Sequence, residues 1–98
     1  MSDLVKMTIE GGVATVTIDN PPVNAQSMDT IAAITDCFDQ ASDLEEVRVV
    51  VLTATGKMFS AGADLKNRPD LSAPGATWKR NRAVREIGYS IMECRKPV

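Results

Sequence analysis

The chain has 98 residues, with 11 lysines and arginines against 13 aspartates and glutamates and a formal net charge of −2. A chain of this length forms one domain at most, with a marginal core, so we expect it to be part of a larger folding unit. The near-neutral charge provides no broad electrostatic attraction to nucleic acid or to acidic lipid. Small-molecule chemistry is the favoured class of function.

The two cysteines and the N-terminus bear on location. Cys37 and Cys94 lack the spacing of a disulfide scaffold or a metal-binding knuckle, so we interpret them as reduced thiols that fill the core. The opening "MSDLVKMTIE" holds no apolar run long enough for a signal peptide or a membrane span. The sequence predicts a cytoplasmic protein with no metal ligand set and with neither nucleic acid nor membrane as a partner.

The first half of the chain predicts a hairpin, a loop and a helix. "LVKMTIE" and "VATVTID" alternate apolar and polar residues, and Gly11 and Gly12 between them favour a tight turn between antiparallel strands. "NPPVNAQ" breaks this pattern and predicts an ordered loop, because its prolines remove backbone donors and hold the chain extended. Ser27 is placed to cap a helix over about residues 27–42, with Asp29 in its first turn.

The second half predicts a strand, a loop and a further helix. The β-branched run "VRVVVLT" is typical of a strand that is buried on both faces and parallel to its neighbours. "KNRPDLSAPG" predicts a loop. In the helix expected over "ATWKRNRAVREIGYSIMECRK", a buried stripe would consist of Val84, Ile87, Ile91 and Cys94, and the closing "KPV" resembles the approach to another buried strand. The expected fold class is α/β.

The stretch "MFSAGADL", residues 58–65, is the candidate functional motif. It is not a phosphate-binding P-loop, because Val51 and Met58 stand where that motif needs glycine and a hydroxyl residue. If a short helix begins near Asp64, the N–H groups around Ala63 would lie at its positive end and could bind an oxyanion or a carbonyl. In the alternative interpretation, the small residues only let a strand pass closely under a helix.

A family resemblance favours the first interpretation. "NPPVNAQS", then "VRVVVLTATGKMFSAGADL", then a helix ending in "KPV" resemble the crotonase superfamily, which includes enoyl-CoA hydratases and isomerases. The resemblance implies a spiral of ββα units, with residues 1–98 as the N-terminal portion of one such domain and the remainder absent from this chain. It also implies assembly into homotrimers or hexamers. Coenzyme A would enter only as part of the acyl-CoA substrate, with no separately bound cofactor.

The resemblance also assigns residues. Ala63 matches the position whose backbone N–H is the first donor of an oxyanion hole, and Gly62 would position that loop; such a donor stabilises the enolate formed from an acyl-CoA thioester. Positions along the path of coenzyme A are matched by Val23, Ala25, Ala61, Ala63, Asp64 and Leu65. Asn24 is interpreted as structural, since asparagine can bond its own loop backbone.

The reaction itself is left more open than the oxyanion loop. Hydration of a 2-enoyl-CoA is favoured, and the alternatives are an isomerase, a dehalogenase, a decarboxylase or a non-catalytic module that binds coenzyme A or completes a partner subunit. In the family, the second oxyanion donor and the hydratases' catalytic glutamates follow the "KPV" position. We therefore assign no catalytic role to Glu86 or Glu93, and we expect the 98-residue chain alone to be inactive.

Overall fold

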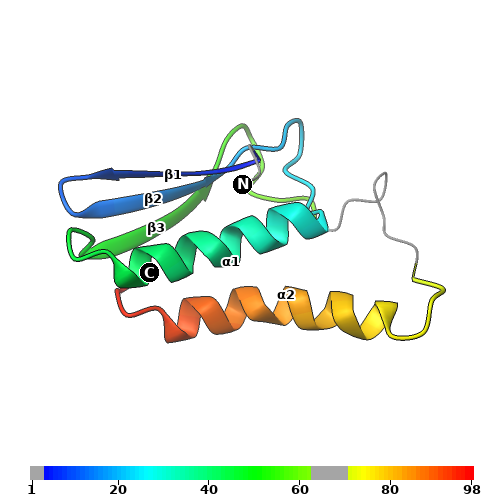
Figure 1. Cartoon of the computed structure of the whole chain (residues 1–98). Coiled ribbons are helices and arrows are strands. Elements are labelled where there is room, and N and C mark those ends of the chain that lie inside the picture. Colours follow the sequence, from blue (N-terminus) through cyan, green and yellow to red (C-terminus); the bar gives the residue numbers. More distant parts are fainter. Residues whose placement is uncertain (1–3, 63–70) are drawn as a thin grey trace.

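The computed structural model describes residues 4–62 and 71–98 and has an α/β architecture. Its elements in chain order are β1 (Val5–Glu10), β2 (Val13–Ile18), α1 (Met28–Asp43), β3 (Val49–Ala54) and α2 (Ala76–Glu93). The strands form one sheet in the order β1-β2-β3; α1 lies between this sheet and α2 (Figure 1). The predicted hairpin, helix, strand and final helix are confirmed.

The hairpin forms as its sequence predicts. β1 and β2 pair antiparallel from Val5 opposite Ile18 to Glu10 opposite Val13. Gly11 and Gly12 join them with φ angles of 57° and 82°. A two-residue turn with positive φ at both positions matches the twist of the strands that it connects, and glycine adopts it without strain.

Helix α1 packs its apolar face on the sheet. Ser27 caps it by accepting a hydrogen bond from the N–H of Thr30 at 3.2 Å, and Asp29 lies in the first turn. The buried core consists of alternate β2 residues, one residue each of β1 and β3, the α1 face and Val47: Val5, Ala14, Val16, Ile18, Ala33, Ile34, Cys37, Phe38, Ala41, Val47 and Val50. Burial raises the pKa of the Cys37 thiol, and both cysteines are free.

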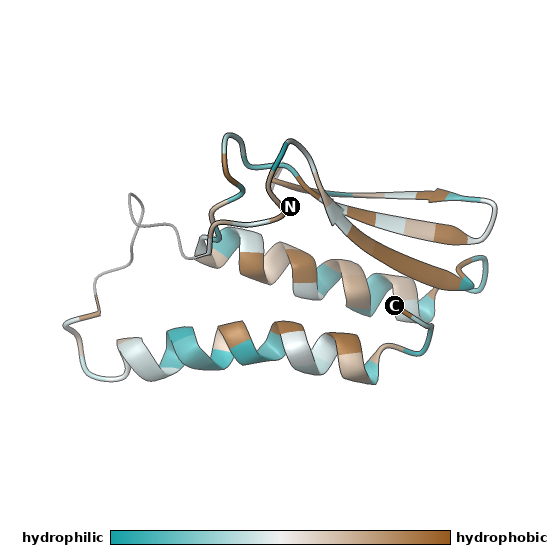
Figure 2. Ribbon diagram, turned by 180° about the vertical axis from the view of Figure 1, so that it is seen from behind, coloured by the Kyte–Doolittle hydropathy of each residue, from teal (hydrophilic) through white to brown (hydrophobic). Residues whose placement is uncertain are grey.

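Strand β3 differs from the prediction on one point. It runs parallel to β2, as expected, from Val49 beside Val13 to Ala54 beside Ile18. Val50 is 1% exposed but Val51 is 44% exposed, so within the described residues the strand is buried on one face and not on both. Figure 2 shows why the sequence is misleading: β3 is hydrophobic along most of its length, although α1 covers only one face of the sheet.

Helix α2 is less buried than its apolar residues predict. Ile87, Ile91 and Cys94 pack against the core, but Val84 is 41% exposed, so its predicted burial is wrong. The helix has no buried residue, and it lies beside α1 on the side away from the sheet (Figure 1). Neither α1 nor α2 is long and apolar enough to cross a membrane.

The segment after α2 is tied to the end of α1 and to β3. Lys96 Nζ donates to the carbonyl oxygens of Leu44 and Val47 at 2.9 and 2.7 Å. The Val50 N–H, on the edge of β3 away from β2, donates to the Pro97 carbonyl at 2.8 Å. These bonds bring the "KPV" segment to the outer edge of β3, as its sequence suggests.

Candidate functional site

Two loops meet at the end of the sheet where β2 and β3 finish. We call residues 19–27 the β2 loop and residues 55–62 the β3 loop. Asn24 of the β2 loop is 1% exposed and has a φ of 54°. A left-handed backbone is uncommon for residues other than glycine, and asparagine is among the side chains that tolerate it.

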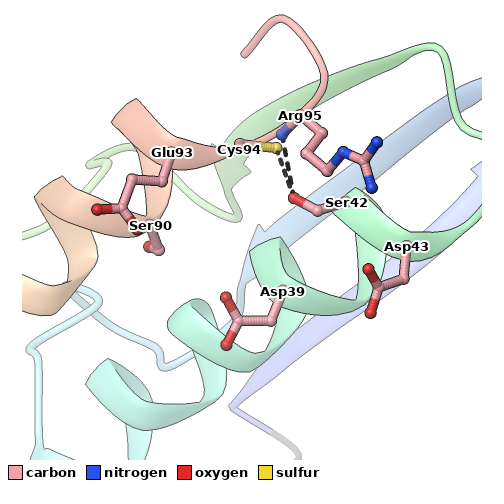
Figure 3. Close-up of a pocket in the computed structure, with 7 residues that line it drawn as sticks. All are labelled: Asp39, Ser42, Asp43, Ser90, Glu93, Cys94 and Arg95. Atoms are coloured by element: carbon pink, nitrogen blue, oxygen red, sulfur yellow. Dashed lines mark hydrogen bonds between the residues drawn. The ribbon is translucent and has the colours of Figure 1, made fainter.

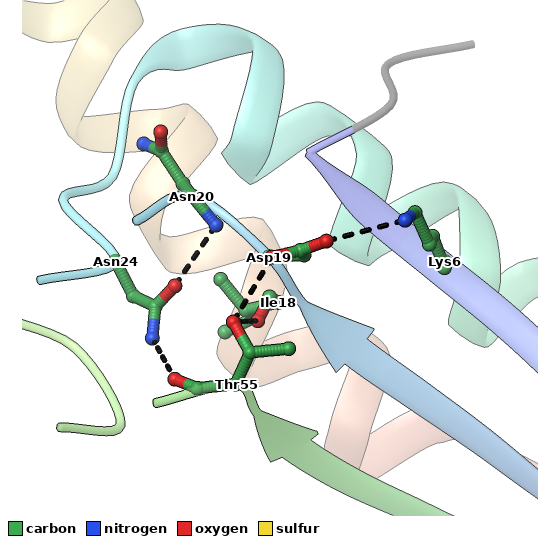
Figure 4. A network of polar contacts seen from close by, with 6 residues as sticks. All are labelled: Lys6, Ile18, Asp19, Asn20, Asn24 and Thr55. Carbon is green, nitrogen blue, oxygen red and sulfur yellow. Dashed lines mark hydrogen bonds and ion pairs between the residues drawn. The ribbon is translucent and has the colours of Figure 1, made fainter. Parts of the chain in front are cut away.

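The Asn24 side chain links the two loops. Its Nδ2 donates to the Thr55 carbonyl oxygen at 2.8 Å, and its Oδ1 accepts from the N–H of Asn20 at 2.9 Å (Figure 4). The same Nδ2 also donates to the Met58 carbonyl oxygen at 2.7 Å. The Asn24 N–H in turn donates to the Asn20 carbonyl at 2.8 Å. A buried amide with its polar atoms bonded in this way is a structural group, which confirms the interpretation of Asn24.

Ser60 makes a second link. Its Oγ donates to the Asn24 carbonyl at 2.9 Å and accepts from Gln26 Nε2 and from the Gly62 N–H, each at 3.1 Å. The hydroxyl thus uses its one donor and both of its acceptor positions. Sequence reasoning missed both Ser60 and Gln26, because a side-chain contact between residues this far apart in the chain leaves no local signal.

Backbone bonds complete the junction. The Ala61 N–H donates to the Val23 carbonyl at 2.9 Å, and the Gln26 N–H donates to the Gly62 carbonyl at 2.7 Å. The structure therefore brings Val23 to Ala61, and it brings Gly62 to Gln26, the residue that follows Ala25. The other three predicted site residues, Ala63, Asp64 and Leu65, lie outside the described residues, so their roles stay predictions.

The junction presents an accessible surface of small and apolar residues. Val23 is 38% exposed, Ala61 and Gly62 are exposed, and Ala25 is half-buried. At Gly62 the φ is 98°, and a Cβ added there would meet no atom of the described residues within 4 Å. Among those residues, glycine is therefore favoured by the backbone conformation rather than by crowding.

Two backbone N–H groups of the β3 loop already have hydrogen-bond partners. The N–H groups of Ala61 and Gly62 are both occupied, by the Val23 carbonyl and by the Ser60 hydroxyl. Either group would have to break an existing bond before it could donate to a ligand. These two N–H groups are therefore poor candidates for donors to a ligand, and the Ala63 N–H lies outside the described residues.

A surface network holds the same end of the sheet. Asp19 forms an ion pair with Lys6 at 3.2 Å and accepts a hydrogen bond from Thr55 Oγ1 at 3.0 Å (Figure 4). The hydrogen bonds from Lys6 and then from Thr55 lower the pKa of the Asp19 carboxyl. The network adds a tie from β1 and β2 to the start of the β3 loop.

A pocket of about 290 Å³ between α1 and the end of α2 is a weaker candidate for the site. Figure 3 shows its lining: Asp39, Ser42, Asp43, Ser90, Glu93, Cys94 and Arg95. Three carboxylates around it disfavour an anionic ligand. Over residues 4–62 and 71–98, no group of three or more His, Cys, Asp or Glu side chains could hold a metal ion.

Comparison with known proteins shows the family of this chain. A sequence model described as "Enoyl-CoA hydratase/isomerase" matches residues 8–98. A probable enoyl-CoA hydratase of Bacillus subtilis is 37% identical over 89 residues, which are 91% of this chain and 33% of that protein. A hexahydro-indene-carboxyl-CoA hydrolase of Rhodococcus jostii is 33% identical over 95 residues, which are 96% of this chain and 37% of that protein.

A solved structure gives the same result for the fold. The crystal structure of an enoyl-CoA hydratase/carnithine racemase from Magnetospirillum magneticum superposes with a TM-score of 0.88 at 26% identity, over 100% of this chain and 38% of that one. The chain thus spans between 33% and 38% of the length of these three proteins. It belongs to the enoyl-CoA hydratase/isomerase family of the crotonase superfamily, and it corresponds to the start of that family's spiral fold.

Proposed function

We propose that this chain provides the first half of an oxyanion hole for acyl-CoA thioesters, and that the complete enzyme hydrates a 2-enoyl-CoA. The observation that carries the proposal is the pairing of the two loops. Val23 to Gln26 and Ser60 to Gly62 lie side by side through backbone and side-chain bonds, with an exposed surface of small residues between them.

The chemistry follows from where negative charge develops. When a thioester carbonyl becomes an enolate, its oxygen gains charge, and a fixed N–H donor stabilises that charge without having to reorganise. We assign this donor to the N–H of Ala63. The occupied N–H groups of Ala61 and Gly62 hold the backbone of the β3 loop in place as far as Gly62.

The same surface accounts for the binding of coenzyme A. Small side chains at Ala25 and Ala61 let an extended ligand lie against the backbone, while Val23 offers an exposed apolar contact. Asp64 and Leu65 would continue this path. Coenzyme A is then a part of the substrate, held along the loops while its thioester reacts.

The choice of hydration rests on family membership. The hydrolase of Rhodococcus jostii carries a carboxyl-CoA substrate in its name, so the same fold serves more than one reaction. In the proposed mechanism the acid and base groups lie outside these 98 residues, and they decide between hydration, isomerisation, dehalogenation and decarboxylation. Assembly into trimers or hexamers and a cytoplasmic location stay predictions.

An assay of the protein at its full natural length tests the proposal. With crotonyl-CoA, the conjugated enoyl absorbance should decay and the corresponding 3-hydroxyacyl-CoA should accumulate. Binding of crotonyl-CoA without turnover would contradict hydration and favour another acyl-CoA reaction or a binding module. Failure to bind any acyl-CoA or free coenzyme A would contradict the proposal as a whole.

A further inference from the structure

We infer that Asn24 is a positioning residue for the reaction, because its buried side chain sets where the β3 loop presents its backbone to the thioester. The inference rests on the proposed function. It goes beyond that function by assigning a role in catalysis to a side chain that has no place in the oxyanion hole or on the path of coenzyme A.

The first argument is the position of its bonds. Nδ2 donates to the carbonyls of both Thr55 and Met58, which lie on either side of the turn at Gly56, where φ is 79°. A single amide group therefore fixes the conformation of the turn that leads from β3 toward Ser60. The short distances of 2.8 and 2.7 Å leave little freedom for the turn to shift.

The second argument is the path from Asn24 to the reactive end of the loop. The Asn24 carbonyl accepts a hydrogen bond from Ser60 Oγ, and Ser60 Oγ in turn accepts one from the Gly62 N–H. Asn24 is therefore bonded at the start of the β3 loop through its side chain and near the end of that loop through its backbone. A shift of Asn24 would be transmitted to both places.

The third argument concerns the part of the fold that Asn24 holds. Asn24 is not part of the hydrophobic core cluster, which lies between α1 and the sheet. Loss of its side chain should loosen the two loops while leaving this core intact. Since a displacement of about 1 Å can cost about 10²-fold in rate, a loosened loop should affect turnover much more than binding.

The test uses the protein at its full natural length and compares Asn24→Gly with Phe38→Leu. Glycine accepts the positive φ of this site, so Asn24→Gly removes the side chain without backbone strain. Phe38 is fully buried and belongs to the core cluster between α1 and the sheet, so Phe38→Leu should destabilise that core. We expect kcat on crotonyl-CoA to fall about 10- to 100-fold in Asn24→Gly with KM within about threefold, and to stay near the parent value in Phe38→Leu.

A spectral readout distinguishes positioning from loss of stability. A chromophoric enoyl-CoA that does not react should absorb at longer wavelength when its carbonyl is hydrogen-bonded in the site. Asn24→Gly should bind it with a smaller red shift than the parent, and Phe38→Leu with the parent's shift. An Asn24→Gly enzyme with the parent's red shift and kcat would overturn the inference.

A measurement on the parent covers the case in which Asn24→Gly does not fold. Backbone hydrogen exchange should show that the N–H groups of Asn24, Gln26, Ala61 and Gly62 open with one common free energy, and that the unreactive enoyl-CoA protects them together. Independent opening of the two loops would overturn the inference. A parent that binds no enoyl-CoA would instead contradict the proposed function, so the two failures can be told apart.

Discussion

Asn24→Asp makes the strongest prediction for stability, because it keeps the shape of the side chain and changes only its hydrogen-bonding character. The Asn24 amide donates to two backbone carbonyls at 2.8 and 2.7 Å and is 1% exposed. An ionised carboxylate offers no donor, and it places negative charge beside both oxygens. Each buried carbonyl left without a partner costs about 1–3 kcal/mol, so we expect the variant to lose about 2–6 kcal/mol at neutral pH.

The loss should also depend on pH. Burial and the neighbouring carbonyls favour the protonated form of the new aspartate, so its pKa in the folded state should lie above its unfolded value of about 3.9. The folded state then binds more protons than the unfolded state between these two pKa values, and stability falls as pH rises through that window. The deficit of the variant relative to the parent should therefore be smallest near pH ~4 and largest at neutral pH.

Urea unfolding of parent, Asn24→Asp and Asn24→Gly at a series of pH values checks this reasoning. Asn24→Gly loses the same bonds without adding a titratable group, so its deficit should not vary with pH. A pH-independent deficit in Asn24→Asp, or a stability equal to that of the parent, would refute the argument from buried donors.

Three further predictions concern other parts of the fold. Thr35 Oγ1 is buried without a hydrogen-bond partner among the described residues, so Thr35→Val should leave the unfolding free energy unchanged or raise it by up to about 1 kcal/mol, and a clear loss would contradict that assignment. Lys96 donates to two carbonyls, so Lys96→Met should lower the midpoint of thermal unfolding clearly more than Lys96→Arg, and equal effects would contradict a role as donor. The pKa of Asp19 is lowered from 3.8, first by the hydrogen bond from Lys6, so its contribution to stability is present above pH 3.8 and is lost as the pH falls through the lower pKa of the folded state. Asp19→Asn should therefore lower the free energy of unfolding at neutral pH but not in strong acid. An equal loss at both pH values would argue against the ion pair.

The elements that could be predicted from sequence depend on short-range chemistry. Gly11 and Gly12 predict the turn because few residues adopt two successive positive φ angles, and Ser27 predicts the start of α1 because its hydroxyl reaches the N–H of Thr30. Val51 could not be placed correctly from sequence. Its exposure depends on what covers the second face of the sheet, and a run of valines carries no information about that.

In the candidate site, too, local features could be predicted from the sequence and contacts between distant residues could not. The small residues Ala61 and Gly62 after strand β3 could be recognised in the sequence as a candidate site. The contacts that fix them come from Asn24, Gln26 and Ser60, which join segments more than thirty residues apart in the chain. No local pattern predicts such pairs, because they depend on two loops meeting at the same end of a parallel β2–β3 pair.

The central claim is that a backbone N–H at Ala63 stabilises the thioester oxygen, and a pair of variants at this residue tests it most directly. In the protein at its full natural length, Ala63→Pro removes the donor and Ala63→Gly keeps it. We expect Ala63→Pro to lower kcat on crotonyl-CoA by about 10²- to 10³-fold and Ala63→Gly to change it only a few-fold. Circular dichroism and a coenzyme A titration establish that the proline variant keeps its fold and its affinity, since proline also restricts the residue before it. A folded Ala63→Pro enzyme that binds coenzyme A and turns over within a few-fold of the parent would contradict the oxyanion role and leave "FSAGADL" as a close-packed turn.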